Sequence, residues 1–326
     1  MVVGGFAMGD RGQLSLVDAL VAPKLGRNER LDRIAAAVRW DRFARLLRSL
    51  EPDGAGRPPF DPLMMLKAAL LQQWYELSDA ELEEALNDRV SFRRFCGLSL
   101  EAAAPDHTTL CRFRNRLVAA GLAERLFAEF DRQLESAGLV LKRGTMVDAT
   151  LVEAARVRPS REGKAGDADA AFAKRQGKPG STYGYKAHVG VDEGTLLIRA
   201  ARLTPANVNE TSVADDLIRL DERAVYADKA YASRERRARL KGLGIKDRIL
   251  HKSWGGGPAL TPWQKRRNAL IGPIRAGVET VFATLKRRMG YTAVRYVGLV
   301  KNEAHLMLLA IAYNMRRAAV LTPARD

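Results

Sequence analysis

The sequence predicts an α+β protein in which an all-helical region, residues 1–137, precedes an α/β domain with a mixed sheet, residues 138–326. Up to about residue 136, apolar side chains recur at helical spacing, and from about residue 142 short β-rich apolar runs replace them. The second part then alternates strands with helices, which is the order typical of a mixed sheet covered by helices.

The first region contains sequence signals that mark where helices begin and end. The Gly- and Pro-rich run EPDGAGRPP breaks one periodic segment from the next, and Ser78 with Glu81 has the spacing of a capping box. The expected helices cover roughly residues 29–50, 61–77, 81–88, 107–121 and 122–136.

The second region carries strand and turn signals. A turn at Asp192, Glu193 and Gly194 joins two β-rich runs into a hairpin. The expected elements are a strand in 143–155, the hairpin over 184–205, a helix over 209–220, a strand in 223–231, a helix over 233–244, a strand over 245–251 and a long helical region after 258.

Two segments of this region lack a clean period. Residues 156–183 are basic and contain Gly, Pro and Ser, so we expect a mobile loop, which fits a DNA-facing segment and a plain solvated linker equally well. Residues 251–262 form a short insertion around the glycine-rich run SWGGGP.

Composition points to a polyanionic partner. The net charge is +16 and the pI is about 10.1, which favours nucleic acid, although charge that serves only solubility is the plain alternative. No apolar run approaches the ~18–20 residues that span a bilayer, and the opening MVVGGFAM is too short for a signal peptide. Cys96 and Cys111 form no Cys-x-x-Cys pair, so neither a disulfide framework nor a zinc site is predicted, and a cytoplasmic location fits.

Two acids directly follow apolar runs, where solubility alone does not explain an acid. Asp148 and Asp228 each follow a short apolar run that is typical of a core strand. In open α/β sheets, sites form at the carboxyl ends of strands, whereas a single Asp there is more often a turn former or a helix cap. Carboxylates hold Mg²⁺ for phosphodiester chemistry, so two such acids in a basic protein favour a metal site.

A third acid stands out against a basic background. Between Asp247 and Glu303 there are eleven Lys or Arg and one carboxylate, Glu279. Arg275 and Lys286 fall beside Glu279 on one edge of a single predicted helix. The apolar residues of this helix recur at helical spacing and are expected to form its core stripe, which consists of Val278, Val281, Phe282, Leu285 and Met289. Alone, Arg275 and Glu279 would be a weak surface pair four residues apart; the two aspartates favour a functional role.

The segments VDAT, VYADKAY and IRAGVETVFATLKRRMGY resemble the Asp-Asp-Glu transposases of bacterial insertion sequences, and among them the insertion-sequence-five family. The similarity covers most of residues 55–318. The helix signature of that superfamily is Tyr-x₂-Arg-x₃-Glu-x₆-Lys, and Arg275, Glu279 and Lys286 match it at the right spacing. Gly272 occupies the Tyr position, which puts the DNA contact of that Tyr in doubt and leaves the metal site unaffected.

The resemblance implies an RNase H-like domain in which Asp148, Asp228 and Glu279 are catalytic and bind two Mg²⁺ ions, with Mn²⁺ able to substitute. One ion would activate the attacking water or 3′-OH, and the other would stabilise the leaving 3′ oxygen. Arg275 and Lys286 would hold phosphates near the cut.

The resemblance also implies further contacts with double-stranded DNA. Lys229 and Tyr231 would position DNA, although Tyr231 fits a core residue equally well, and Trp254 fits either base stacking or packing. In the helical region, short polar side chains at a helix start with arginines behind them suit a helix-turn-helix reader, or an ordinary basic helix face. The other residues expected to contact DNA are Arg287, Arg288 and Arg295 in the catalytic domain and Thr108, Thr109, Arg112, Arg114 and Arg116 in the helical region.

The implied function is a transposase that binds the terminal inverted repeats of its insertion sequence, cuts DNA strands and transfers them to target DNA. Because two element ends must meet, a homodimer or a larger assembly on DNA is expected, associated with the nucleoid in the bacterial cytoplasm and without a membrane partner. Two alternatives stay open: a catalytically silent DNA-binding regulator, which would be a domesticated transposase, and an RNase H-like nuclease that cuts without joining.

Overall fold

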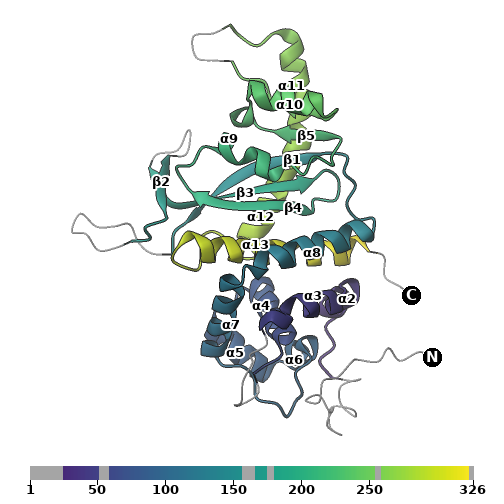
Figure 1. Cartoon of the computed structure of the whole chain (residues 1–326), viewed down its shortest axis with the longest axis vertical. Coiled ribbons are helices and arrows are strands. Elements are labelled where there is room, and N and C mark those ends of the chain that lie inside the picture. The colour runs from purple at the N-terminus through teal and green to yellow at the C-terminus, as the bar shows by residue number, and fades with distance from the viewer. Residues whose placement is uncertain (1–24, 51–58, 156–165, 175–179, 254–257, 323–326) are drawn as a thin grey trace. The chain divides into compact units, whose positions relative to one another are not determined.

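The computed structural model describes residues 25–50, 59–155, 166–174, 180–253 and 258–322. The chain divides into two compact units, one up to Ala120 and the other from Gly121 (Figure 1). This boundary is one helix earlier than the predicted one at residue 137, because α8 (Leu122–Ser136) packs on the last helix of the second unit, α13 (Leu299–Leu321). In the described part of the chain, no helix is long and apolar enough to cross a membrane.

The first unit is built from helices, as predicted. The expected single segment 29–50 forms two helices because the backbone is extended at Val38 (φ −111°, ψ 133°). The capping box is present, since the Glu81 amide donates to Ser78 Oγ and the Ser78 amide donates to the Glu81 carboxylate. The described elements are α2 (Glu29–Ala37), α3 (Trp40–Leu47), the 3₁₀ turn η1 (Arg48–Leu50), α4 (Pro62–Tyr75), α5 (Asp79–Asp88), α6 (Val90–Cys96), which was not predicted, and α7 (His107–Ala119).

The second unit contains a mixed six-stranded sheet (Figure 1). Strand β3 pairs antiparallel with β1, β2 and β4, whereas β1, β5 and β6 run parallel to one another. The strands are β1 (Thr145–Glu153), β2 (Ala171–Lys174), β3 (Ser181–Asp192), β4 (Ile198–Pro205), β5 (Ala224–Ala227) and β6 (Lys246–Ile249).

Part of the expected loop 156–183 is ordered structure. It contains β2 and the start of β3, and buried Asp167 anchors it by accepting hydrogen bonds from the Tyr185 hydroxyl (2.7 Å) and the Gly298 amide (3.0 Å). Residues 156–165 and 175–179 of that loop, and Trp254 of the insertion, lie outside the described residues.

The expected amphipathic helix 209–220 is much shorter than predicted. It consists of one turn of α-helix, α9 (Glu210–Val213), and a 3₁₀ turn, η2 (Ala214–Leu217). The backbone becomes extended at Ile218 (φ −100°, ψ 118°), which ends the helical segment. Further along, η3 (Lys229–Tyr231) follows β5, and α10 (Arg234–Gly242) precedes β6.

The sequence predicts one helix around Glu279, but the structure has two helices there. Helix α11 (Pro262–Arg275) ends before Ala276, and α12 (Gly277–Arg288) begins after it. Pro273 lies in the last turn of α11 and has no amide hydrogen for a helical hydrogen bond. At Gly277, an added Cβ would lie 3.1 Å from Met146 Sδ, so the glycine allows α12 to approach β1 closely.

Buried Arg199 of β4 joins α8 to the sheet. Its guanidinium lies 3.6 Å from Asp131 and 2.5 Å from Glu135, both on α8, and 2.8 Å from Asp221. Arg199 is fully buried and Asp131 is 1% exposed, so each charge depends on the other. Removing one member of such a pair leaves an uncompensated buried charge.

We therefore expect Arg199→Ala to lower the free energy of unfolding by about 3–5 kcal/mol, measured on the full chain by urea denaturation followed by circular dichroism. Arg202→Ala is the control on the same strand, because Arg202 is 39% exposed and its ion-pair distances are 3.7 and 3.8 Å; it should change stability by less than about 1 kcal/mol. Equal losses for the two variants would contradict this role of Arg199.

Candidate active site

The sheet places Asp148 and Asp228 next to each other. The parallel pairing of β1 with β5 ends at Val147 and Ala227, and each acid is the residue that directly follows in sequence. Beyond this point β1 continues to Glu153 along β3, whereas the chain after β5 turns into η3. Asp148 is therefore inside a strand and not at its end, but it lies where its neighbouring strand stops.

Asp148 is mostly buried, with 14% of its side chain exposed. Its Oδ1 accepts a hydrogen bond from the Ala149 amide (2.9 Å). Burial raises the pKa of Asp148 to about 6; Arg275 opposes the shift, and the negative charges of Glu210 and Asp228 add to it. The burial of Asp148, more than the charge of its neighbours, therefore sets its pKa.

Arg275 connects the first acid to the third. Its Nη2 donates to Asp148 Oδ2 (2.5 Å) and its Nη1 lies 3.2 Å from Glu279 Oε1. Glu279 is 65% exposed, and without Arg275 it would be an ordinary surface residue of α12. The helix break at Ala276 leaves this contact intact, so Asp148, Arg275 and Glu279 form one connected group.

The three acids suit a divalent metal chemically, since carboxylate oxygens are the ligands of Mg²⁺. Within the described ranges, no group of three or more Asp, Glu, His or Cys side chains is placed to hold a metal ion. Arg275 lies between Asp148 and Glu279 and supplies positive charge there. A metal that used all three acids would have to replace this arginine between them.

Helix α12 brings Glu279 to the sheet through its apolar face. Lys286 Nζ donates to the Leu151 carbonyl of β1 (2.9 Å), so this predicted phosphate ligand also fastens α12 to the strand that carries Asp148. The predicted core stripe is buried, and its members are Val278, Val281, Phe282, Leu285 and Met289.

The other predicted DNA contacts of this unit differ in their exposure to solvent. Arg287, Arg288 and Lys229 are exposed, and Arg295 is half-buried. Tyr231 is fully buried in an apolar cluster with Val147 and Leu240, so it does not face DNA here. Only the core interpretation of Tyr231 agrees with its burial.

In the first unit, the arginines of α7 differ in their surroundings. Arg114 makes two hydrogen bonds of 2.7 Å to Asp79 of α5, and Arg116 donates to the Leu50 carbonyl. Arg114 thus joins α7 to α5, whereas Arg116 is exposed, and the groove-reading role of both arginines stays a prediction. Arg112 is exposed, as is Thr108, whereas Thr109 is half-buried.

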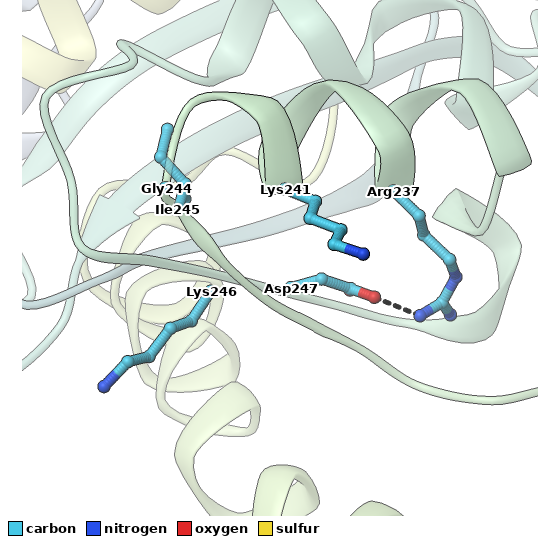
Figure 2. A pocket seen from close by; sticks show the side chains of 6 residues that line it. All are labelled: Arg237, Lys241, Gly244, Ile245, Lys246 and Asp247. Carbon is cyan, nitrogen blue, oxygen red and sulfur yellow. Dashed lines mark hydrogen bonds and ion pairs between the residues drawn. The ribbon is translucent and has the colours of Figure 1, made fainter.

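A basic groove lies away from the three acids. It measures about 440 Å³ and is lined by residues of α10, β6 and the turn between them (Figure 2). Arg237 pairs with Asp247, Lys241 lies beside them, and Lys246 points away. Residues 229–270 contain twelve Lys or Arg and two acids, so this part of the unit carries a net positive charge. None of the three candidate catalytic acids lines the groove.

Comparisons with known proteins cover both units. Residues 141–315, more than half of the chain and including all three acids, match a family model described as Transposase DDE domain. Residues 21–116 match a second one, described as Transposase domain (DUF772). Among solved structures, the chain is similar to a cryo-EM structure of the piggyBac transposase synaptic complex with hairpin DNA, at 13% identity and a TM-score of 0.44, covering 91% of this chain and 73% of that one.

The pKa of Asp148 predicts a pH-dependent stability difference. Because the folded pKa, about 6, is above the ordinary value of 3.8, ionisation favours the unfolded chain. The cost to stability is absent below about pH 4, grows up to pH 6 and is complete above it. With chelator present, Asp148→Asn should therefore gain stability relative to the unaltered chain between pH 4 and 6, by about 2–3 kcal/mol. Urea denaturation at several pH values measures this, and Asp216→Asn, an exposed acid, should show no such trend.

Proposed function

Because the chain belongs to the family of DDE-domain transposases, we propose that it binds the ends of a mobile DNA element and cuts and joins DNA strands, with Asp148, Asp228 and Glu279 as the catalytic carboxylates. The observation that carries this proposal has two parts: Asp148 and Asp228 follow the last paired residues of β1 and β5, and Arg275 links Asp148 to Glu279. The mixed sheet supports an RNase H-like fold, and the Arg275-x₃-Glu279-x₆-Lys286 spacing supports the insertion-sequence-five family and a bacterial source.

We propose that the three carboxylates hold two divalent cations, Mg²⁺ or Mn²⁺. When bound, such ions activate an attacking water or 3′-OH and stabilise the leaving 3′ oxygen. The protein contributes position and charge, which dominate catalysis of phosphoryl transfer. Asp148 is fixed by the sheet, Asp228 by its bond to the Lys229 amide (2.7 Å), and Glu279 by α12.

The exposed cations supply the DNA contacts in this proposal. Lys229 directly follows Asp228, so its positive charge lies next to a catalytic acid along the chain. Arg287 and Arg288 end the helix that carries Glu279, eight and nine residues after this acid. In the first unit, the first turn of α7 exposes Thr108 and the helix further exposes Arg112, which supports the reading of terminal inverted repeats by this helix. A homodimer or larger assembly follows from the need to hold two element ends.

The reaction is tested with a labelled duplex that contains the terminal repeat found beside the coding region, in the presence of Mg²⁺. The unaltered chain should cut at the tip and join the product to target DNA. Asp148→Asn, Asp228→Asn and Glu279→Gln should each abolish cutting and leave binding to the repeat near normal, since only the acids are lost. Binding without cutting in Mg²⁺ or Mn²⁺ would favour a silent regulator, and cutting without joining would favour a nuclease.

Two arginines of α7 test whether this helix recognises the ends of the DNA element. Arg112→Ala should weaken binding to the repeat by about tenfold without changing the stability of the chain, because Arg112 is exposed. Arg114→Ala should instead lower the free energy of unfolding by about 1–3 kcal/mol, because Asp79 loses its bidentate partner. Fluorescence anisotropy and urea denaturation measure the two effects, and unchanged binding by Arg112→Ala would remove this residue from the DNA contact.

A further inference from the structure

The basic groove between α10 and β6 lies on the outer side of an edge strand, since β6 pairs only with β5. Two arginines occupy the carbonyl groups of this edge. Arg267 of α11 donates to the carbonyls of Asp247 and Ile249, and Arg237 of α10 donates to those of Ile249 and Leu250. A peptide that added to β6 as a further strand would have to displace both arginines, so this edge is closed to that kind of partner.

The one acid that lines the groove is already neutralised. The Asp247 carboxylate accepts a hydrogen bond from Arg237, lies 3.7 Å from the Arg267 guanidinium and accepts the Ile249 amide (2.8 Å). Because two cations share this carboxylate, it repels an approaching anion less than a lone acid would.

Two lysines of the groove keep their charge free. Within the part of the chain that the structure describes, the side chains of Lys241 and Lys246 are exposed and make no hydrogen bond or ion pair. Lys241 lies beside the pair of Arg237 and Asp247, and Lys246 points away from it (Figure 2). Exposed Arg234 precedes Lys241 by seven residues, about two helical turns, so it lies on the same side of α10. The groove is therefore bordered by cations that can take an anionic partner.

Side chains that read bases through an amide are missing around these cations. Residues 229–253 contain no Asn or Gln. In α11, Gln264 accepts the Thr261 amide (3.0 Å), and Asn268 binds the amide and the carbonyl of His251 (2.9 and 3.1 Å), so both amides serve the protein backbone. A lysine ammonium binds phosphate as a point charge, and phosphate contacts carry no sequence information. The groove thus suits the backbone of a nucleic acid and not a particular sequence.

The groove lies beside the strand that leads to Asp228, at a distance from the acids themselves. Lys246 is opposite Ala224 of β5, four residues before Asp228, which is about 13 Å along the strand. DNA held in the groove is therefore a different stretch from the phosphodiester at the acids, but both lie on the same unit.

We propose that the basic groove binds target DNA, with Lys241 and Lys246 in contact with the phosphates of a duplex of any sequence. This inference rests on the proposed function, in which a cut end is joined to a second duplex. A second copy of this chain would bring the same positive charge to the groove and be repelled. A duplex instead offers a dense row of negative charges that free lysines neutralise.

The test measures binding of the full chain to a labelled duplex that lacks the terminal repeat, by fluorescence anisotropy at several salt concentrations. Lys241→Gln and Lys246→Gln together should weaken binding by about tenfold and lower the slope of log Kd against log salt by about 1.8, which is about 0.9 per lost phosphate contact. The matched control combines Lys174→Gln and Lys301→Gln, which remove the same charge from two exposed lysines of the same unit. It should leave the slope unchanged.

The joining assay then identifies the duplex. The groove variant should bind and cut the terminal repeat near normally, and join the cut end about tenfold less at limiting target DNA. Excess target DNA should restore joining, because only the affinity for the target is reduced.

The other outcomes separate this inference from the proposed function. An unchanged salt slope, or an equal loss in the control, would make the groove a solvated surface and leave the proposed function standing. Loss of repeat binding or cutting in the groove variant would place the element's own DNA in the groove and overturn the assignment to the target. If the unaltered chain neither cuts nor joins DNA, the proposed function fails and the target assignment fails with it. Circular dichroism checks folding, and the two single variants decide if the double variant does not fold.

Discussion

The parallel pairing of β1 with β5 is the interaction on which the centre depends. Val147 and Ala227, the last paired residues, are each 1% exposed, so burial fixes the two strands at this point. Asp148 continues in β1 because β3 still pairs with it, whereas Asp228 leaves the sheet and accepts the Lys229 amide at the start of η3. Two acids that are 80 residues apart in sequence thus become neighbours through backbone hydrogen bonds.

The second requirement is a cation close to buried Asp148. An ionised carboxylate in such surroundings is costly unless it is paired, and Arg275 provides the pair. Gly277 makes this possible because it lets α12 approach Met146, two residues before Asp148. Close packing of α12, and not the helical spacing alone, therefore brings Arg275 and Glu279 to the sheet.

The sequence was sufficient for features that depend on local pattern. Apolar runs located the strands before Asp148 and Asp228, and helical spacing found the buried face of α12. Sequence patterns did not predict features that depend on contacts between residues far apart in the chain. Strand β2 exists because it pairs with β3, and buried Asp167 orders the chain before it.

Arg275 shows why a motif gives the position of a side chain without giving its partner. The spacing to Glu279 and Lys286 predicted a phosphate ligand, yet the guanidinium is 19% exposed and donates to two carboxylates. A guanidinium has five N–H donors in a fixed plane, and the two terminal nitrogens here already point at Asp148 and Glu279. In this arrangement Arg275 neutralises the acids, and a phosphate that approached it would meet the negative charges of both. The cations available to DNA in this structure are therefore exposed ones, such as Lys229 directly after Asp228 and Arg288 at the end of α12.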